Sequence, residues 1–241
     1  MNHSLGLIIA VDGGQSSTIA MIATLEGQVI GTGFAGPSNH ADEPGGHERL
    51  RGALDQSVSE ALAESGQDPT QVVGLCLGMT GGANLAFDLM TTQYPGARVQ
   101  SYYDYVTALA GASLTQPGVV VIGGTGAVAY GRSADGREVK AGGWGYLMGD
   151  EGSGYDIGRR ALQMAAQASD GRIEMTRLLH MIPTQLGLTD LAGVHKMLYS
   201  GQVTRPKLRV SPSQSSLLLR SVIESRGGCS RKQQKNWQRR L

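Results

Sequence analysis

One arrangement of short apolar runs and glycine-containing turns occurs twice in this sequence, and it restricts the folds that the chain can adopt. Each copy has three runs separated by two turns. The runs lie at residues 5–11, 18–25 and 29–35 in the first copy and at residues 119–122, 127–131 and 138–140 in the second. Short apolar runs separated by Gly, Asp and Ser turns are typical of β-hairpins. The sequence therefore predicts that each half of the chain begins with three strands joined by tight turns.

Helical periodicity follows each set of strands. After Pro44-Gly45-Gly46, apolar residues recur at intervals of three and four over about twenty residues, which predicts an amphipathic helix. Further helices are predicted at residues 84–90 and 105–112, from residue 155 onward, and at residues 173–181 and 190–198, with further strands at residues 72–77 and 98–102. Alternating strands and helices indicate an α/β chain, and two such halves facing each other would form a cleft for a ligand.

Length and composition fit an ordinary globular chain. The 241 residues are 40% hydrophobic and 17% charged, enough for one large domain or two small ones. No apolar run approaches the roughly 18 residues of a membrane span, and the first residues lack the basic start of a signal peptide. The cysteines (Cys76 and Cys229) and the histidines His40 and His47 do not have metal-ligand spacing. We therefore predict a cytoplasmic protein without a zinc site or a disulfide framework.

The segment from residue 141 to residue 160 is rich in glycine. It contains seven of the chain's 36 glycines, Trp144 and the adjacent acids Asp150 and Glu151, and it leads into a helical pattern. Glycine is used where the backbone bends unusually or comes close to a ligand. The segment therefore predicts a loop that holds a polar small molecule through its backbone and Asp150. The alternative is a surface turn whose glycines only provide positive φ angles.

A turn of Gly, Ser and Thr residues follows the first strand of each copy. The residues concerned are Asp12, Gly13, Gly14 and Ser16 in the first copy and Gly124, Thr125 and Gly126 in the second. Such turns can direct backbone N–H groups and a hydroxyl at phosphate oxygens, and Asp12 could hold Mg²⁺ against them. Asp104, just after the strand at residues 98–102, could accept the proton of an attacking hydroxyl. These features together indicate a small-molecule kinase.

Two other nucleotide-binding motifs fit less well. Residues 124–129, GTGAVA, match the dinucleotide fingerprint G-x-G-x-x-A, but that fingerprint requires a helix next, and residues 127–131 are β-like. The P-loop pattern G-x-x-x-x-G-K-[ST] does not occur. The sequence therefore predicts neither NAD or FAD binding nor a P-loop.

Five segments resemble, in order and spacing, the N-acetylglucosamine kinase and BadF/BadG group of the sugar kinase/actin/Hsp70 superfamily. They are VDGGQSS (11–17), GPSNH (36–40), DYVTALAG (104–111), VVVIGGTGAVAYGR (119–132) and GGWGYLMGDEGSGYDIGR (142–159). The resemblance implies an α/β fold with two ribonuclease-H-like (actin-like ATPase) domains, the second incomplete. The implied limits are residues 1–115 for the first domain, residues 116–205 for the second and residues 206–241 for a divergent basic tail.

The resemblance also implies roles for individual residues. Ser16 and Thr125 would contact ATP phosphates, and Asp104 would be the catalytic base at the 6-hydroxyl of an amino sugar. The sugar would be held by Asn39, His40, Gly143, Trp144 and Asp150. The implied activity is phosphorylation of N-acetylglucosamine or glucosamine with ATP and Mg²⁺, without a nucleic-acid or membrane partner; a homodimer is left open.

The sequence departs from the group's pattern in two places. Gln15-Ser16 stands where the group has Gly-Thr, a change that keeps a hydroxyl. After Arg205-Pro206 the group continues with a glycine turn for adenosine and a final helix, whereas residues 206–241 contain nine Lys or Arg residues and one acid. We interpret this tail as a truncated, frame-shifted end. The rival interpretation, a basic arm for nucleic acid or anionic surfaces, lacks an aromatic stacking platform.

Two other functions are compatible with the same fold. A BadF-type ATPase that activates a dehydratase would need cysteine ligands for an iron–sulfur cluster, and neither Cys76 in a strand nor Cys229 in the tail suits that role. A non-catalytic remnant would bind sugar but not ATP, because the adenosine site is missing.

Overall fold

The computed structural model describes residues 6–114 and 116–200. The chain divides into two compact units: Met1–Val121 with Ala129–Ala141, and Ile122–Val128 with Gly142–Leu241. The domain limits at residues 115 and 205 stay predictions, and the tail at residues 206–241 lies outside the described residues. Each unit is described by itself.

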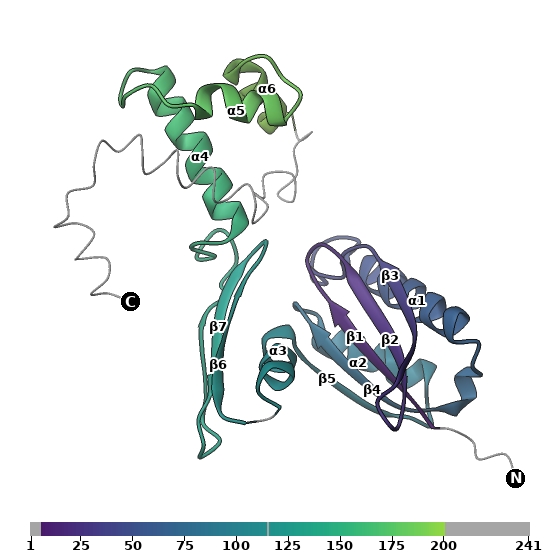
Figure 1. Ribbon diagram of the computed structural model, residues 1–241. Coiled ribbons are helices and arrows are strands. Elements are labelled where there is room, and N and C mark those ends of the chain that lie inside the picture. The colour runs from purple at the N-terminus through teal and green to yellow at the C-terminus, as the bar shows by residue number, and fades with distance from the viewer. Residues whose placement is uncertain (1–5, 115, 201–241) are drawn as a thin grey trace, which may run out of the picture. The chain divides into compact units, whose positions relative to one another are not determined.

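A five-stranded mixed sheet forms the centre of the first unit (Figure 1). Its strands lie in the order β3 (Val29–Ala35), β2 (Thr18–Thr24), β1 (Leu7–Gly13), β4 (Val72–Met79) and β5 (Arg98–Tyr103). Strand β2 is antiparallel to both β1 and β3, whereas β1, β4 and β5 run parallel. All five predicted strands are confirmed, as are the α/β class and the hairpin turn at Glu26-Gly27, where the Gly27 N–H donates to the Thr24 carbonyl.

Two helices pack on one face of this sheet, and a third lies on the other. Helices α1 (Gly46–Ser65) and α2 (Ala83–Gln93) share one hydrophobic core with the sheet. Its largest fully buried side chains are Leu7, Ile9, Ile22, Leu50, Leu54, Val58, Leu77, Met79 and Met90. Helix α3 (Asp104–Ser113) packs through Thr107 against Gly78, which lies between Leu77 and Met79 and so faces the opposite side.

Glycine in β3 allows α1 to lie directly on the sheet. A side-chain carbon at Gly33 would lie 1.9 Å from the carbonyl oxygen of Ser57, and one at Gly31 would lie 2.2 Å from that of Ala61. Both distances are far inside van der Waals contact. The helix therefore packs backbone to backbone on this strand, which fixes the position of α1 and of the loop that precedes it.

The carboxyl ends of the three parallel strands lie next to one another. In the register of the sheet, Asp12 of β1 is paired with Gly78 of β4, and Gly78 is paired with Tyr102 of β5. Ligands of open α/β sheets bind beyond the carboxyl ends of the strands. The residues that follow β4 and β5, together with Asp12, therefore share one edge of the sheet.

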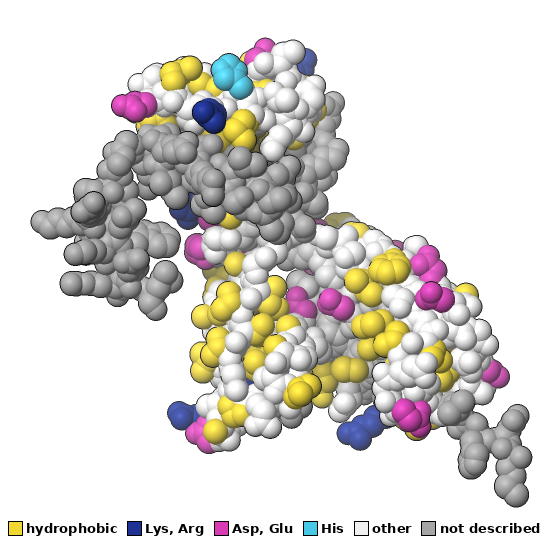
Figure 2. Space-filling view, viewed as in Figure 1, with side chains coloured by type: hydrophobic (Ala, Val, Ile, Leu, Met, Phe, Trp, Pro, Cys, Tyr) yellow, Lys and Arg dark blue, Asp and Glu magenta, His cyan; other side chains and the backbone are white. Residues whose placement is uncertain are grey.

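A second sheet has the order β6 (Gly118–Gly123), β7 (Ala127–Arg132) and β8 (Glu138–Gly142). The predicted strands and the predicted turn at residues 133–136 are confirmed, because the Gly136 N–H donates to the Ser133 carbonyl. Val119, Val121 and Val139 are at least 70% exposed, and Figure 2 shows hydrophobic side chains gathered over this sheet.

Three helices follow in the second unit: α4 (Gly154–Ser169), α5 (Leu178–Gln185) and α6 (Leu191–Tyr199). They share a small core of Ala161, Ala165, Leu178, Ile182 and Val194. The helix predicted at residues 173–181 begins later, at Leu178. The hydroxyl and carbonyl of Thr176 accept the N–H groups of Leu178 and Leu179, so a local turn takes the place of the expected first helical turn.

In the described part of the chain, no helix has the length and apolar character needed to cross a membrane.

Candidate functional site

The carboxylate of Asp104 is held at both of its oxygens. Asp104 is the first residue of α3, directly after β5. Its Oδ1 accepts the backbone N–H of Tyr105 at 2.8 Å, and its Oδ2 accepts the hydroxyl of Thr80 at 2.5 Å. The Thr107 hydroxyl donates to the Asp104 carbonyl at 2.9 Å. Both the side chain and the backbone of Asp104 are thus fixed, at the edge where ligands of such sheets bind.

Asp12 shares this edge with Asp104. Burial and, to a smaller extent, the negative charge of Asp104 raise the pKa of Asp12 above its ordinary value. A cation beside Asp12 would offset both effects and stabilise its ionised form. Among the described residues there is no group of three or more His, Cys, Asp or Glu residues that could hold a metal ion. A single carboxylate such as Asp12 would be compatible with Mg²⁺, which commonly uses one or two protein carboxylates and completes its shell with phosphate and water.

Gly13, the last residue of β1, has little space around it for a side chain. A side-chain carbon at Gly13 would lie 2.5 Å from Cε of Met79 and 2.7 Å from Oγ of Ser38. The Gly14 N–H donates to the Ser17 carbonyl at 2.9 Å, which closes the turn that contains Ser16. The predicted phosphate residues Gly13, Gly14 and Ser16 therefore lie in a tight hairpin beside Asp12.

The loop that carries Asn39 and His40 is fixed by an arginine on α1. Nη2 of Arg49 donates to the carbonyl oxygens of Asn39 (2.8 Å) and His40 (2.9 Å), and Nε donates to the Asn39 carbonyl at 3.2 Å. Asn39 is buried, and His40 has a left-handed backbone with φ 57°. The Ser38 N–H donates to the Gly14 carbonyl, which ties this loop to the β1 turn. Sequence reasoning missed Arg49, because an arginine in the first turn of a surface helix carries no distinguishing signal.

In the second unit, Asp150 lies against the Gly124-Thr125-Gly126 turn. Its Oδ1 accepts the N–H of Ala127 at 3.1 Å, whereas Oδ2 is buried without a hydrogen-bond partner. Asp150 is 3% exposed and has φ 63°, a conformation that costs energy for any residue with a side chain. A strained, buried carboxylate with an unused oxygen is typical of a ligand-binding position.

The glycine-rich segment on both sides of Asp150 is bent at several points. Positive φ angles occur at Gly142, Gly143, Gly145 and Gly152. The Gly143 N–H donates to the Ala127 carbonyl at 2.8 Å, and Trp144 is 65% exposed. The surface-turn interpretation accounts for these four glycines. It does not account for Asp150, because turn geometry alone would favour glycine there as well.

The predicted site residues fall into two groups, one in each unit. The first unit brings together Asp12, Gly13, Gly14, Ser16, Asn39, His40 and Asp104. The second unit brings together Gly124, Thr125, Gly126, Gly143, Trp144 and Asp150. Each group is linked internally by the contacts described above.

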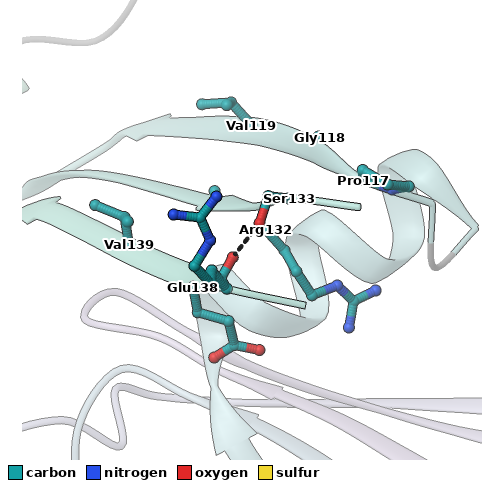
Figure 3. A pocket seen from close by; sticks show the side chains of 9 residues that line it. Pro117, Gly118, Val119, Arg132, Ser133, Glu138 and Val139 are labelled. Carbon is teal, nitrogen blue, oxygen red and sulfur yellow. Dashed lines mark hydrogen bonds between the residues drawn. The ribbon is translucent and has the colours of Figure 1, made fainter. Parts of the chain in front are cut away.

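A groove lies on the three-stranded sheet (Figure 3). It is lined by Pro117, Gly118, Val119, Gly131, Arg132, Ser133, Arg137, Glu138 and Val139. In Figure 3, Val119 and Val139 point to one side of the sheet and Glu138 to the other. None of the predicted site residues lines this groove.

Comparison with known proteins gives three findings. The family described as the BadF/BadG/BcrA/BcrD ATPase family matches residues 9–216. The N-acetylmuramic acid/N-acetylglucosamine kinase of Clostridium acetobutylicum is 35% identical over 208 residues, 83% of this chain and 67% of the relative. The N-acetyl-D-glucosamine kinase of Dictyostelium discoideum is 28% identical over 76% of this chain and 61% of the relative.

A solved structure is similar over most of the described fold. It comes from Chromobacterium violaceum, is described only as a candidate N-acetylglucosamine kinase, and superposes with a TM-score of 0.73 at 29% identity, over 92% of this chain and 80% of that chain. The chain spans about two thirds or less of the length of the two curated relatives named above.

Proposed function

The chain belongs to the BadF/BadG/BcrA/BcrD ATPase family, and from this premise we propose that it is an ATP-dependent amino-sugar kinase. The proposed reaction is phosphorylation of N-acetylglucosamine or glucosamine at the 6-hydroxyl. The names of its relatives support the substrate class, since two of them are kinases of N-acetylated amino sugars.

The geometry of Asp104 is the observation that carries this proposal. A general base must have a fixed, ionisable oxygen within hydrogen-bond reach of the proton that it accepts. Hydrogen bonds from Tyr105 and Thr80 fix the carboxylate, and each oxygen keeps a lone pair for a further donor. In the proposed mechanism, Asp104 accepts the proton of the sugar 6-hydroxyl as that oxygen attacks the terminal phosphorus of ATP. The bond from this phosphorus to the bridging oxygen breaks, and ADP leaves.

The two glycine turns are the proposed phosphate sites. Gly13, Gly14 and Ser16 in one turn and Gly124, Thr125 and Gly126 in the other would direct N–H and hydroxyl groups at ATP. Asp12 would hold Mg²⁺; its raised pKa is consistent with a carboxylate that lacks a counter-charge. When bound, the metal supplies positive charge that neutralises the phosphates.

The sugar would be held by the Asn39 loop and the Asp150 loop. Oδ2 of Asp150, which is buried and unpaired, would accept a sugar hydroxyl, and the exposed Trp144 would cover an apolar face of the ring. Asn39, His40 and Gly143 would provide the remaining contacts. The finer fold assignment is also part of the proposal: two ribonuclease-H-like domains, the second incomplete, supported by the strand order β3-β2-β1-β4-β5. The cytoplasmic location and the homodimer stay predictions.

A second candidate function is a sugar-binding remnant without turnover. It would use the same proposed sugar residues as the kinase and would differ from the kinase only in turnover. The activator alternative has less support. Cys76, a free cysteine in the described chain, lies in β4, and burial raises the pKa of its thiol, which disfavours the thiolate needed to bind a cluster.

One assay separates these functions. ADP release would be measured with ATP and Mg²⁺, with and without N-acetylglucosamine, glucosamine or N-acetylmuramic acid, and sugar binding would be measured by calorimetry. Sugar-dependent ADP release supports the kinase, and its loss with EDTA supports the metal. Sugar-independent hydrolysis indicates the activator, and binding without turnover indicates the remnant.

A further inference from the structure

Thr80 connects the ends of three parallel strands. It directly follows β4, between Asp12 at the end of β1 and Asp104 after β5. Its N–H donates to the Gly13 carbonyl at 2.8 Å, and its hydroxyl donates to Oδ2 of Asp104 at 2.5 Å. One residue therefore binds the phosphate turn through its backbone and the proposed base through its side chain.

We propose that Thr80 is a positioning residue that fixes the carboxylate of Asp104 for proton transfer; this inference rests on the proposed kinase function. The terminal torsion of an aspartate is broad, so a single hydrogen bond leaves the carboxylate free to rotate. The Tyr105 N–H holds Oδ1, and the Thr80 hydroxyl holds Oδ2. With both oxygens held, the plane of the carboxylate is set, and its remaining lone pairs face fixed directions.

The backbone around Thr80 is itself rigidly placed. The Thr80 N–H is anchored on β1, and the Gly81 N–H donates to the Met79 carbonyl at 3.0 Å. Gly81 and Gly82 then have φ angles of 81° and 68°, which turn the chain into α2. Few residues with a side chain adopt such angles. The hydroxyl of Thr80 is therefore presented to Asp104 from a position that the surrounding turn determines.

The test compares Thr80→Val, which removes the hydroxyl and keeps the shape, with Thr80→Ser, which keeps the hydroxyl. Both variants keep the backbone N–H that donates to the Gly13 carbonyl. A matched control is Thr92→Val on α2, whose hydroxyl donates to the Asp88 carbonyl at an exposed position. Sugar-dependent kcat and the KM values for sugar and ATP would be measured for the full chain. We expect Thr80→Val to lower kcat about 10- to 100-fold with both KM values within about threefold, and Thr80→Ser to recover most of the rate.

The outcomes separate this inference from the proposed function. Wild-type kcat in Thr80→Val overturns the inference, and so does a loss of rate that Thr80→Ser shares. If the wild-type chain shows no sugar-dependent turnover, the proposed function fails. The free energies of unfolding of Thr80→Val, Asp104→Asn and the double variant then show whether the two side chains are coupled. If the double variant loses as much unfolding free energy as the two single variants added together, the inference is overturned. A loss smaller than that sum supports the inference.

Discussion

Oδ1 of Asp150 accepts the backbone N–H of Ala127 at 3.1 Å, and the same carboxylate lies so close to Gly126 that a side-chain carbon there would meet it at 3.0 Å. The Asp150 loop and the Gly124-Thr125-Gly126 turn of the second unit are thus in direct contact. A change in Gly126 or in Asp150 therefore affects the carboxylate that we propose for sugar binding.

Replacing Asp150 tests this relationship through sugar affinity. Asp150→Ala removes the buried acceptor and is expected to raise the sugar KM or Kd about 10-fold or more, since a hydrogen bond to a charged group contributes about 1.5–3 kcal/mol. ATP affinity in the absence of sugar should change less. Asp135→Ala, in an exposed turn, is the control. An unchanged sugar affinity in Asp150→Ala, measured by calorimetry, would remove this residue from the site.

Arg49 is expected to act on sugar binding through the loop that it holds. Arg49→Lys keeps the charge but cannot reproduce the planar arrangement of donors that reaches the carbonyls of Asn39 and His40. We expect the sugar KM to rise about 5- to 20-fold. Arg51→Lys on the exposed side of α1 should leave it unchanged. An equal sugar KM in Arg49→Lys and Arg51→Lys would show that sugar binding by the loop does not depend on Arg49.

The packing of α1 on β3 predicts a large loss of stability for a small change. Gly33→Ala would place a methyl group 1.9 Å from the Ser57 carbonyl oxygen and should lower the free energy of unfolding by about 3 kcal/mol, the upper end for overpacking. Gly52→Ala, at an exposed position on α1 with no atom within 4 Å of the added carbon, should instead raise it by about 0.5–1 kcal/mol. Urea unfolding measures both. A Gly33→Ala protein as stable as wild type would contradict the close packing.

The start of α4 gives a pH-dependent prediction. Burial alone would raise the pKa of Asp156, but the Gly152 N–H and the guanidinium groups of Arg160 and Arg159 hold it below its ordinary value. The folded pKa is thus below the unfolded value of about 3.9. The stabilisation is therefore complete above about pH 4 and is lost as the pH falls through the folded pKa.

Asp156→Asn should accordingly lower the free energy of unfolding by about 1–3 kcal/mol at pH 7 and by much less at pH 2. Asp170→Asn, which affects an exposed pair with Arg172, should change it by less than about 1 kcal/mol. Thermal unfolding followed by circular dichroism at the two pH values provides the comparison. If Asp156→Asn lowers the free energy of unfolding equally at both pH values, the ionised carboxylate does not have this stabilising role.

Much of the fold could be predicted from apolar periodicity, because β1, β2, β4 and α1 each bury a set of regularly spaced apolar residues. The start of α5 could not, since a local turn at Thr176 competes with a helical pattern that continues upstream. The roles of Thr80 and Arg49 also could not be predicted from the sequence. Their contacts with Asp104 and with the Asn39 loop depend on how distant segments pack, and neither residue type is unusual at its position.

The most direct measurement is sugar-dependent turnover in Asp104→Asn. The amide keeps the size of the side chain but cannot act as a base, and a positioned general base contributes about 10²- to 10⁴-fold to the rate. We predict a loss of that size with sugar affinity within a few-fold of wild type, while Asp88→Asn on the exposed side of α2 keeps the wild-type rate. Wild-type turnover in Asp104→Asn would contradict the account.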